Sequence, residues 1–208
     1  MEPLIAIALV WGAAAVAPGP DFLVIAHASA AGSRRRGLAT VLGIACGTVI
    51  WGAAGFFGIS ALFALAPWLF AALKLAGGGY LVYLGLRLLW AARRSAPPVA
   101  GVAAGASARE GGLAAAWARG LMTNLANPKT AIFTASVFAA MLPADPSVAL
   151  GAATVATIAG VSLVWYLIVA LALSSGPARR LYGRCERAVL AFAGGLFVLF
   201  GLRLAAAR

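Results

Sequence analysis

The stretch "AVAPGPDFLVIA", from Ala15 to Ala26, places two prolines and a carboxylate inside one of the most apolar segments of the chain. Proline removes a backbone N–H donor and clashes with the preceding turn, so Pro18 and Pro20 are expected to break a helix here. Asp21 follows the break directly. An apolar segment that carries both a helix break and a charge needs a physical reason, and the rest of the sequence supplies one.

The composition excludes a soluble globular protein. Of the 208 residues, 63% are hydrophobic and 10% are charged, whereas a soluble domain is about half apolar and about a quarter charged. The apolar residues form blocks of about twenty or more, the length at which a helix crosses about 30 Å of hydrocarbon. The net charge of +11 comes from arginines in short segments between these blocks, which is typical of membrane topology signals and not of nucleic-acid binding. The sequence therefore predicts an all-α, multi-pass membrane protein in contact with the lipid bilayer.

The apolar pattern predicts six transmembrane helices in a single domain, residues 1–208. Their approximate ranges are 3–30, 37–64, 67–92, 117–142, 147–174 and 187–205. A linker at about 93–116, rich in Pro, Gly, Ala and Ser, separates one half (about 1–92) from the other (about 117–208). The first, third and fifth loops carry the arginines, so these loops are predicted to be cytoplasmic and both termini periplasmic.

The two halves resemble each other. The segment "ATVLGIACGTVIW" (39–51) aligns with "ATVATIAGVSLVW" (153–165), and "GGYLVYLGLRL" (78–88) aligns with "GGLFVLFGLRL" (194–204). Each half has an odd number of predicted helices, so the second copy must cross the membrane in the opposite direction. Inverted-topology repeats of this kind are typical of secondary transporters.

The repeat explains the opening stretch. Aligning Pro20 with Pro128 places Asp21 against Lys129, so that each half begins with a helix that is broken and charged near its middle. Corresponding broken helices in two inverted halves indicate a binding site at the membrane midplane, where irregular backbone persists only if protein or a water-filled cavity satisfies it. The alternative is a pair of structural proline kinks.

The prolines also predict where hydrogen-bond acceptors become available. Pro18, Pro20 and Pro128 lack the N–H groups that would bond, in an unbroken helix, to the backbone carbonyls of three residues, namely Ala14, Val16 and Asn124. These carbonyls are expected to accept from an ammonium group or from a proton-carrying water.

Asp21 and Lys129 each cost about 2.5–3.5 kcal/mol at the centre of a membrane helix, which makes them candidates for function. We expect them to form an ion pair in the empty carrier, which a zwitterion then replaces by placing its ammonium on Asp21. Its carboxylate would lie on Lys129 or on the N–H groups at a half-helix start. Asp21 could also take up a proton, because burial penalises the charged carboxylate. The alternative is a permanent structural salt bridge.

Three further residues are site candidates. Trp51 and Trp165 are equivalent in the repeat and lie well inside their spans, where they line the cavity or face lipid. Lys74 lies in the third predicted helix, where it serves the site or extends outward to the interface. With one histidine and two cysteines that lack metal-ligand spacing, the sequence predicts no metal site and no cofactor. The hydroxyl side chains of the spans have no apparent His partner, so no enzyme is predicted.

The segments "APGPDFLVIAHASAAGSRRRGLATVLGIACGTVIW", "LKLAGGGYLVYLGLRLL" and "GLMTNLANPKTAIFTASVFAAMLP" resemble the lysine-exporter (LysE) superfamily, in particular its homoserine/threonine efflux (RhtB-type) branch. The resemblance covers essentially the whole chain. It implies a bacterial inner-membrane exporter of amino acids that is driven by the proton gradient and forms a homodimer. The residues that match the family motifs by position are Pro18, Gly19, Pro20, Asp21, Asn124, Asn127, Pro128 and Lys129.

One motif position departs from the family pattern. The residue after Pro-Gly-Pro is often Asn in the family, whereas it is Asp21 here, so proton uptake by a carboxylate at this position is not a general requirement of the family. The predicted spans contain no second acidic residue to bind a dibasic substrate, which favours a neutral, homoserine- or threonine-like amino acid. The alternatives are export of another small polar solute or cation, and a non-transporting membrane assembly protein.

Overall fold

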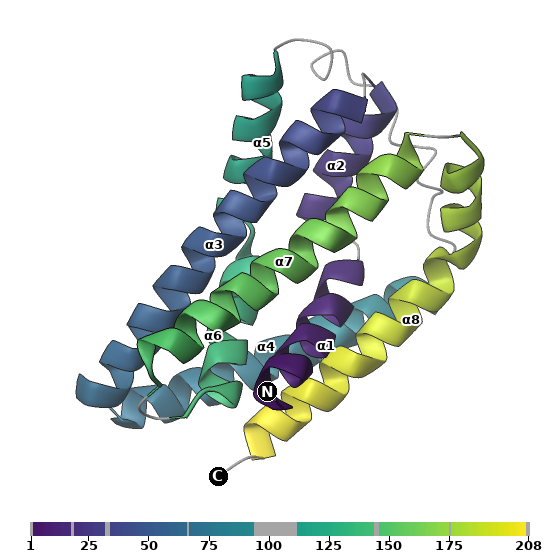
Figure 1. Cartoon of the computed structure of the whole chain (residues 1–208). Coiled ribbons are helices and arrows are strands. Elements are labelled where there is room, and N and C mark those ends of the chain that lie inside the picture. The colour runs from purple at the N-terminus through teal and green to yellow at the C-terminus, as the bar shows by residue number, and fades with distance from the viewer. Residues whose placement is uncertain are drawn as a thin grey trace.

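The computed structural model describes residues 2–17, 19–31, 34–65, 67–93, 112–143, 146–174 and 176–206. Within these ranges the chain is helical and contains no strand, which confirms the predicted all-α class (Figure 1). The helices are α1 (Glu2–Val16), α2 (Pro20–Ala31), α3 (Arg34–Leu65), α4 (Pro67–Arg93), α5 (Leu113–Leu125), α6 (Pro128–Met141), α7 (Val148–Leu173) and α8 (Gly176–Ala206).

Both predicted helix breaks are present. The first predicted span is divided into α1 and α2, which are bent by 61° relative to each other, and the fourth is divided into α5 and α6. Pro20 and Pro128 are the first residues of α2 and α6, where proline fits because the first N–H groups of a helix have no intrahelical partner. Pro18 lies outside the described residues.

The remaining helices agree with the predicted ranges, with two differences at their ends. α8 begins at Gly176, well before the predicted start at residue 187. The basic segment predicted as a loop is helical because arginine has a high helix propensity and the proline at position 177 is tolerated in a first turn. α5 begins at Leu113, inside the predicted linker (93–116), of which residues 94–111 lie outside the described residues.

Glycines allow α3 to lie close to α7 and α5. A Cβ on Gly52 would lie 3.1 Å from Ile158 Cδ1 of α7, and one on Gly47 would lie 3.0 Å from Asn124 Cβ of α5. The contacts of Phe56 with Gly151 and of Gly52 with Ile158 run in opposite directions along the two chains, so α3 and α7 are antiparallel. α3 therefore lies between α5 and α7, as Figure 1 shows.

α4 and α8 contact each other through four glycines. A Cβ on Gly85 would lie 2.7 Å from the Gly194 carbonyl oxygen, and one on Gly194 would lie 2.8 Å from that of Gly85. Gly201 approaches the Gly78 backbone in the same way. The sequence repeat aligns Gly78 with Gly194 and Gly85 with Gly201, so exchanging the two halves converts one contact into the other. Small residues permit such close backbone contact between membrane helices.

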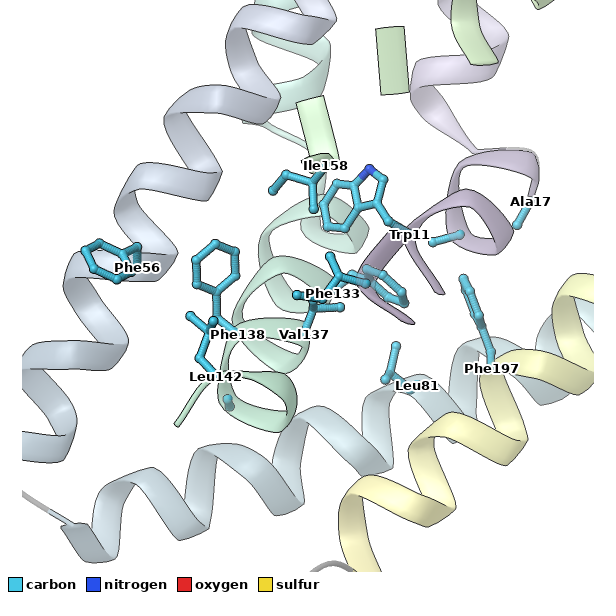
Figure 2. Packing of buried hydrophobic residues seen from close by; sticks show 13 residues of the cluster. Trp11, Ala17, Phe56, Leu81, Phe133, Val137, Phe138, Leu142, Ile158 and Phe197 are labelled. Atoms are coloured by element: carbon cyan, nitrogen blue, oxygen red, sulfur yellow. The ribbon is translucent and has the colours of Figure 1, made fainter. Parts of the chain in front are cut away.

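Two apolar clusters hold the helices together. The larger, which we call the Phe133 cluster, gathers buried side chains from α1, α3, α4, α6, α7 and α8 (Figure 2). The smaller, the Phe22 cluster, combines α2 with the first half of α3 and the second half of α7. Along α7, Ile158 belongs to the Phe133 cluster and Tyr166 to the Phe22 cluster, with Ser162 between them. A polar layer therefore lies between two apolar ones, at the level of the helix breaks.

Two described segments, Arg34–Gly58 and Val148–Leu173, are single helices long and apolar enough to cross a membrane. The bent pair Leu4–Val16 and Pro20–Ser29 makes a third if it is counted as one span. The predictions of six spans and of inverted halves go beyond this finding.

Candidate substrate site at the two helix breaks

The first break ends α1 with acceptors that Lys129 occupies. The Lys129 Nζ donates to the carbonyl oxygens of Ala14, at 2.9 Å, and of Ala17, at 2.8 Å. Ala14 is one of the residues whose carbonyl was predicted to be freed by proline, and its predicted role as an acceptor for an ammonium group is confirmed. The C-terminal end of a helix carries partial negative charge, which stabilises a cation there.

The second break is organised by two asparagines. Asn127 caps α6, because its Oδ1 accepts from the backbone N–H of Lys129 at 3.0 Å. The carbonyl oxygen of Asn124, also predicted to be freed, accepts from Trp51 Nε1 at 3.2 Å and from the Asn127 N–H at 3.1 Å. The freed carbonyl of the break is thus satisfied by an indole and a backbone N–H. The Asn124 side chain is therefore available to bond to another residue.

Asp21 reaches across to the second break. Its side chain is 4% exposed, and its Oδ2 accepts from Asn124 Nδ2 at 2.9 Å and from Thr130 Oγ1 at 3.4 Å. Its Oδ1 is buried and has no hydrogen-bond partner among the described residues. Asp21 lies in the first turn of α2, where the partial positive charge of the helix end favours a carboxylate.

The expected ion pair between Asp21 and Lys129 is wrong. Among the described residues these two side chains form no salt bridge, and each is held by groups of the other break instead. The physical reason is that α1 ends in two carbonyls that satisfy the ammonium, while an amide of α5 satisfies one carboxylate oxygen. The two charges are therefore separately held.

The two breaks enclose a small pocket together with α3 and α7. Its cavity volume is about 30 Å³, room for about two water molecules. The polar side chains that line it come from α2, α3, α5, α6 and α7 and the residue that caps α6; they include Asp21, Thr48, Asn124, Asn127, Lys129, Thr130, Ser162 and Tyr166.

Five of the predicted site residues line this pocket, namely Gly19, Asp21, Asn124, Asn127 and Lys129. Pro20 and Pro128 are exposed and shape the breaks without lining the pocket.

The remaining predicted residues lie elsewhere. Trp51 contacts the site through the Asn124 carbonyl and does not line the pocket. Trp165 packs against the Phe22 cluster, away from the pocket. Pro18 and the side chain of Lys74 lie outside what the structure describes.

The sequence analysis missed several pocket residues as site candidates, among them Trp11, Thr48 and Ser162. Trp11 Nε1 donates to Ser162 Oγ at 2.7 Å. Thr48 and Ser162 occupy equivalent positions of the aligned segments 39–51 and 153–165, and that equivalence is a signal that could have found them. No comparable signal in the sequence marks Trp11.

Comparison with known proteins identifies the family of this chain. A family model described as LysE type translocator matches residues 13–208. The chain is 31% identical over 202 residues to the threonine efflux protein of Salmonella typhi, with 97% of each chain covered, and 31% identical over 205 residues to that of Escherichia coli K12, again with 97% of each covered. It is 30% identical over 213 residues to the uncharacterized membrane protein YahN of Escherichia coli K12, covering 98% of this chain and 91% of the relative. No solved structure matches the chain at a significant level.

These relatives are bacterial membrane proteins, and the family model spans nearly the whole chain. The family description and the efflux relatives indicate a transporter rather than an enzyme. The chain belongs to the LysE type translocator family, as an inner-membrane transporter similar to the threonine efflux proteins of its RhtB-type branch.

Proposed function

We propose that this chain exports a neutral amino acid of the threonine or homoserine kind from the cytoplasm, coupled to the proton gradient. The observation that carries the proposal is the pocket between the two helix breaks, where Asp21 and Lys129 are both present but not paired with each other. The efflux relatives named above, whose names specify threonine, support the same substrate class.

The unused hydrogen-bonding capacity of the two charged side chains matches a zwitterion. An ammonium has three donors, and Lys129 Nζ uses two of them on α1, which leaves one for a substrate carboxylate. Asp21 has an unpartnered Oδ1, which accepts from a substrate ammonium. One carboxylate and one ammonium in the pocket leave the charge balanced when a neutral amino acid binds, whereas a dibasic substrate would bring an uncompensated charge.

Proton coupling is assigned to Asp21. A buried carboxylate held by neutral donors, with one oxygen that has no partner among the described residues, can exchange a proton for the substrate ammonium without disturbing the Lys129 contacts. Export of the amino acid and import of the proton would then use the same oxygen in turn.

Transport requires the pocket to open alternately to the two sides of the membrane. The Phe133 and Phe22 clusters close it from opposite directions, so we assign them as the two gates. We further propose six spans, in which α1 with α2 and α5 with α6 each count as one, arranged as inverted halves with both termini in the periplasm. The reciprocal glycine contacts of α4 with α8 and the antiparallel α3 and α7 support this arrangement. The homodimer implied by the family resemblance is part of the same proposal.

The test uses purified protein in liposomes loaded with labelled threonine, under an imposed pH gradient. We expect saturable, gradient-dependent efflux from the wild type, loss of efflux in Lys129→Gln, and efflux that no longer depends on the gradient in Asp21→Asn. Thr157→Val is the matched control, because Thr157 bonds to its own helix at Ala153 and does not line the pocket. Efflux unchanged in both site variants would overturn the site assignment, and no efflux of any neutral amino acid by folded wild type would overturn the function.

A further inference from the structure

Several hydroxyl side chains in or next to the helices of this protein bond to their own backbone. Five of them donate to the carbonyl four residues earlier, at 2.6–3.0 Å: Thr40, Thr134, Ser136, Thr157 and Ser174. Such a bond satisfies the hydroxyl hydrogen within the helix, so these residues have little capacity to recognise anything else.

Thr48 and Ser162 differ from this pattern. Ser29 and Thr154 also have buried hydroxyls without a partner among the described residues, but those two do not line the pocket. Thr48 has no hydrogen-bond partner among the described residues, and Ser162 Oγ is engaged as the acceptor of the Trp11 indole N–H at 2.7 Å. Their side chains are 1% and 2% exposed, and both line the pocket that holds Asp21 and Lys129. Buried polar groups normally have partners, so two hydroxyls with unused capacity at a pocket indicate a missing polar ligand.

The two hydroxyls lie level with each other. α3 and α7 are antiparallel, and Gly52 of α3 contacts Ile158 of α7. One turn earlier on α3 is Thr48, and one turn later on α7 is Ser162, so the two residues occupy the same height on facing helices. They are also equivalent in the sequence repeat. The hydroxyls therefore flank one side of the pocket as a pair.

We infer that Thr48 and Ser162 recognise a hydroxyl group on the substrate side chain and so select threonine over its apolar isostere valine. The inference rests on the proposed function and assigns the specificity of the same site to these two residues. The donors and acceptors are directional: because Ser162 accepts from Trp11, its own hydrogen is available to donate to the substrate oxygen. The substrate hydroxyl then donates to Thr48 Oγ1, which completes a chain from the indole to α3.

Valine has no hydroxyl group and would leave the hydroxyls of Thr48 and Ser162 without this hydrogen-bond partner. A buried polar group without its partner costs about 1–3 kcal/mol, so wild type should prefer threonine by roughly five- to 150-fold. Sites built to hydrogen-bond a substrate hydroxyl reject the analogue that lacks it for this reason.

The experiment measures initial efflux rates of labelled threonine and labelled valine over a range of internal concentrations in the same proteoliposome preparations, and compares their kcat/KM ratio. We expect the ratio to fall at least fivefold in Thr48→Val and in Ser162→Ala, and to return toward the wild-type value in Thr48→Ser. Thr157→Val, the same substitution at a hydroxyl bonded within α7, should keep the wild-type ratio. The ratio is internal to each preparation, so a smaller amount of folded variant does not change it.

The outcomes separate this inference from the proposed function. A wild type that exports neutral amino acids without preferring threonine over valine would overturn the inference and leave the function standing. Equal loss of threonine and valine efflux in Thr48→Val and Ser162→Ala would also overturn it, because it would show that the hydroxyls serve the helix packing. Absence of any amino-acid efflux in the wild type would overturn both.

Discussion

The two helix breaks lie at corresponding places in the chain, yet their charged residues behave differently. Asp21 has a short side chain and stays near the N-terminal end of α2, where a carboxylate is favoured. Lys129 lies in the first turn of α6, where a cation is disfavoured, and its long side chain carries the ammonium to the C-terminal end of α1. Both charges therefore lie at helix ends of opposite sign. The comparison teaches that each charged side chain is hydrogen-bonded to uncharged groups of the other break and not to its counter-charge, which leaves both available to a zwitterion.

Removing the ammonium should disturb the first break most. Lys129→Met leaves the carbonyls of Ala14 and Ala17 without the donor seen in the structure, and a buried unpaired carbonyl costs about 1–3 kcal/mol. We expect a marked loss of thermal stability in detergent, together with loss of efflux. Lys129→Arg keeps a donor for the same carbonyls and should retain most of the stability. Equal melting temperatures for Lys129→Met and wild type would show that the ammonium does not support the end of α1.

A steric clash at the second break should have the next largest effect on stability and efflux. In Gly47→Ala the new Cβ would lie 2.5 Å from Asn124 Oδ1 and 3.0 Å from Asn124 Cβ, so the side chain that holds Asp21 must move. Overpacking of this kind costs about 1–3 kcal/mol. Gly160→Ala is the control, since nothing lies within 4 Å of a Cβ there. Comparable stability and efflux in the two variants would contradict the close contact between α3 and α5.

The cap of α6 tests the second break without altering its charges. Asn127→Ala removes the acceptor for the Lys129 N–H, and loss of such a cap costs about 1 kcal/mol. We expect a modest drop in melting temperature with weaker threonine efflux, because Asn127 also lines the pocket. Asn127→Ser, which can still cap and adds no charge, should recover the stability. A melting temperature unchanged in Asn127→Ala would argue that the start of α6 is held by other contacts.

Trp51 should matter least among these residues. Trp51→Phe removes one of the two donors to the Asn124 carbonyl and leaves the Asn127 N–H in place. We expect a loss of about 1 kcal/mol or less and efflux near the wild-type level, measured in parallel by melting and transport. A complete loss of efflux would mean that the indole has a direct role in the site, as the sequence analysis expected for a cavity-lining residue.

The sequence predicted the breaks because proline acts locally, through its missing N–H and its fixed ring. It also placed Asp21 and Lys129 at one site, because the repeat aligned them. It failed on their pairing, since whether an ammonium meets a carboxylate or a carbonyl depends on distances between helices that no local pattern encodes. Trp165 failed for the same reason, because its position in the repeat does not say which side of α7 faces the pocket.

Substrate protection of the pocket tests the central claim most directly. Ala15 lines the pocket and is buried, so Ala15→Cys places one thiol there in a background where the exposed Cys46 and Cys185 are replaced by serine. The rate of alkylation by N-ethylmaleimide is measured with and without threonine, and again after adding Lys129→Gln. The account predicts that threonine slows alkylation in a saturable manner and that Lys129→Gln abolishes this protection. Alkylation that is unaffected by threonine at concentrations that saturate efflux would contradict the claim that the pocket between the two breaks is the substrate site.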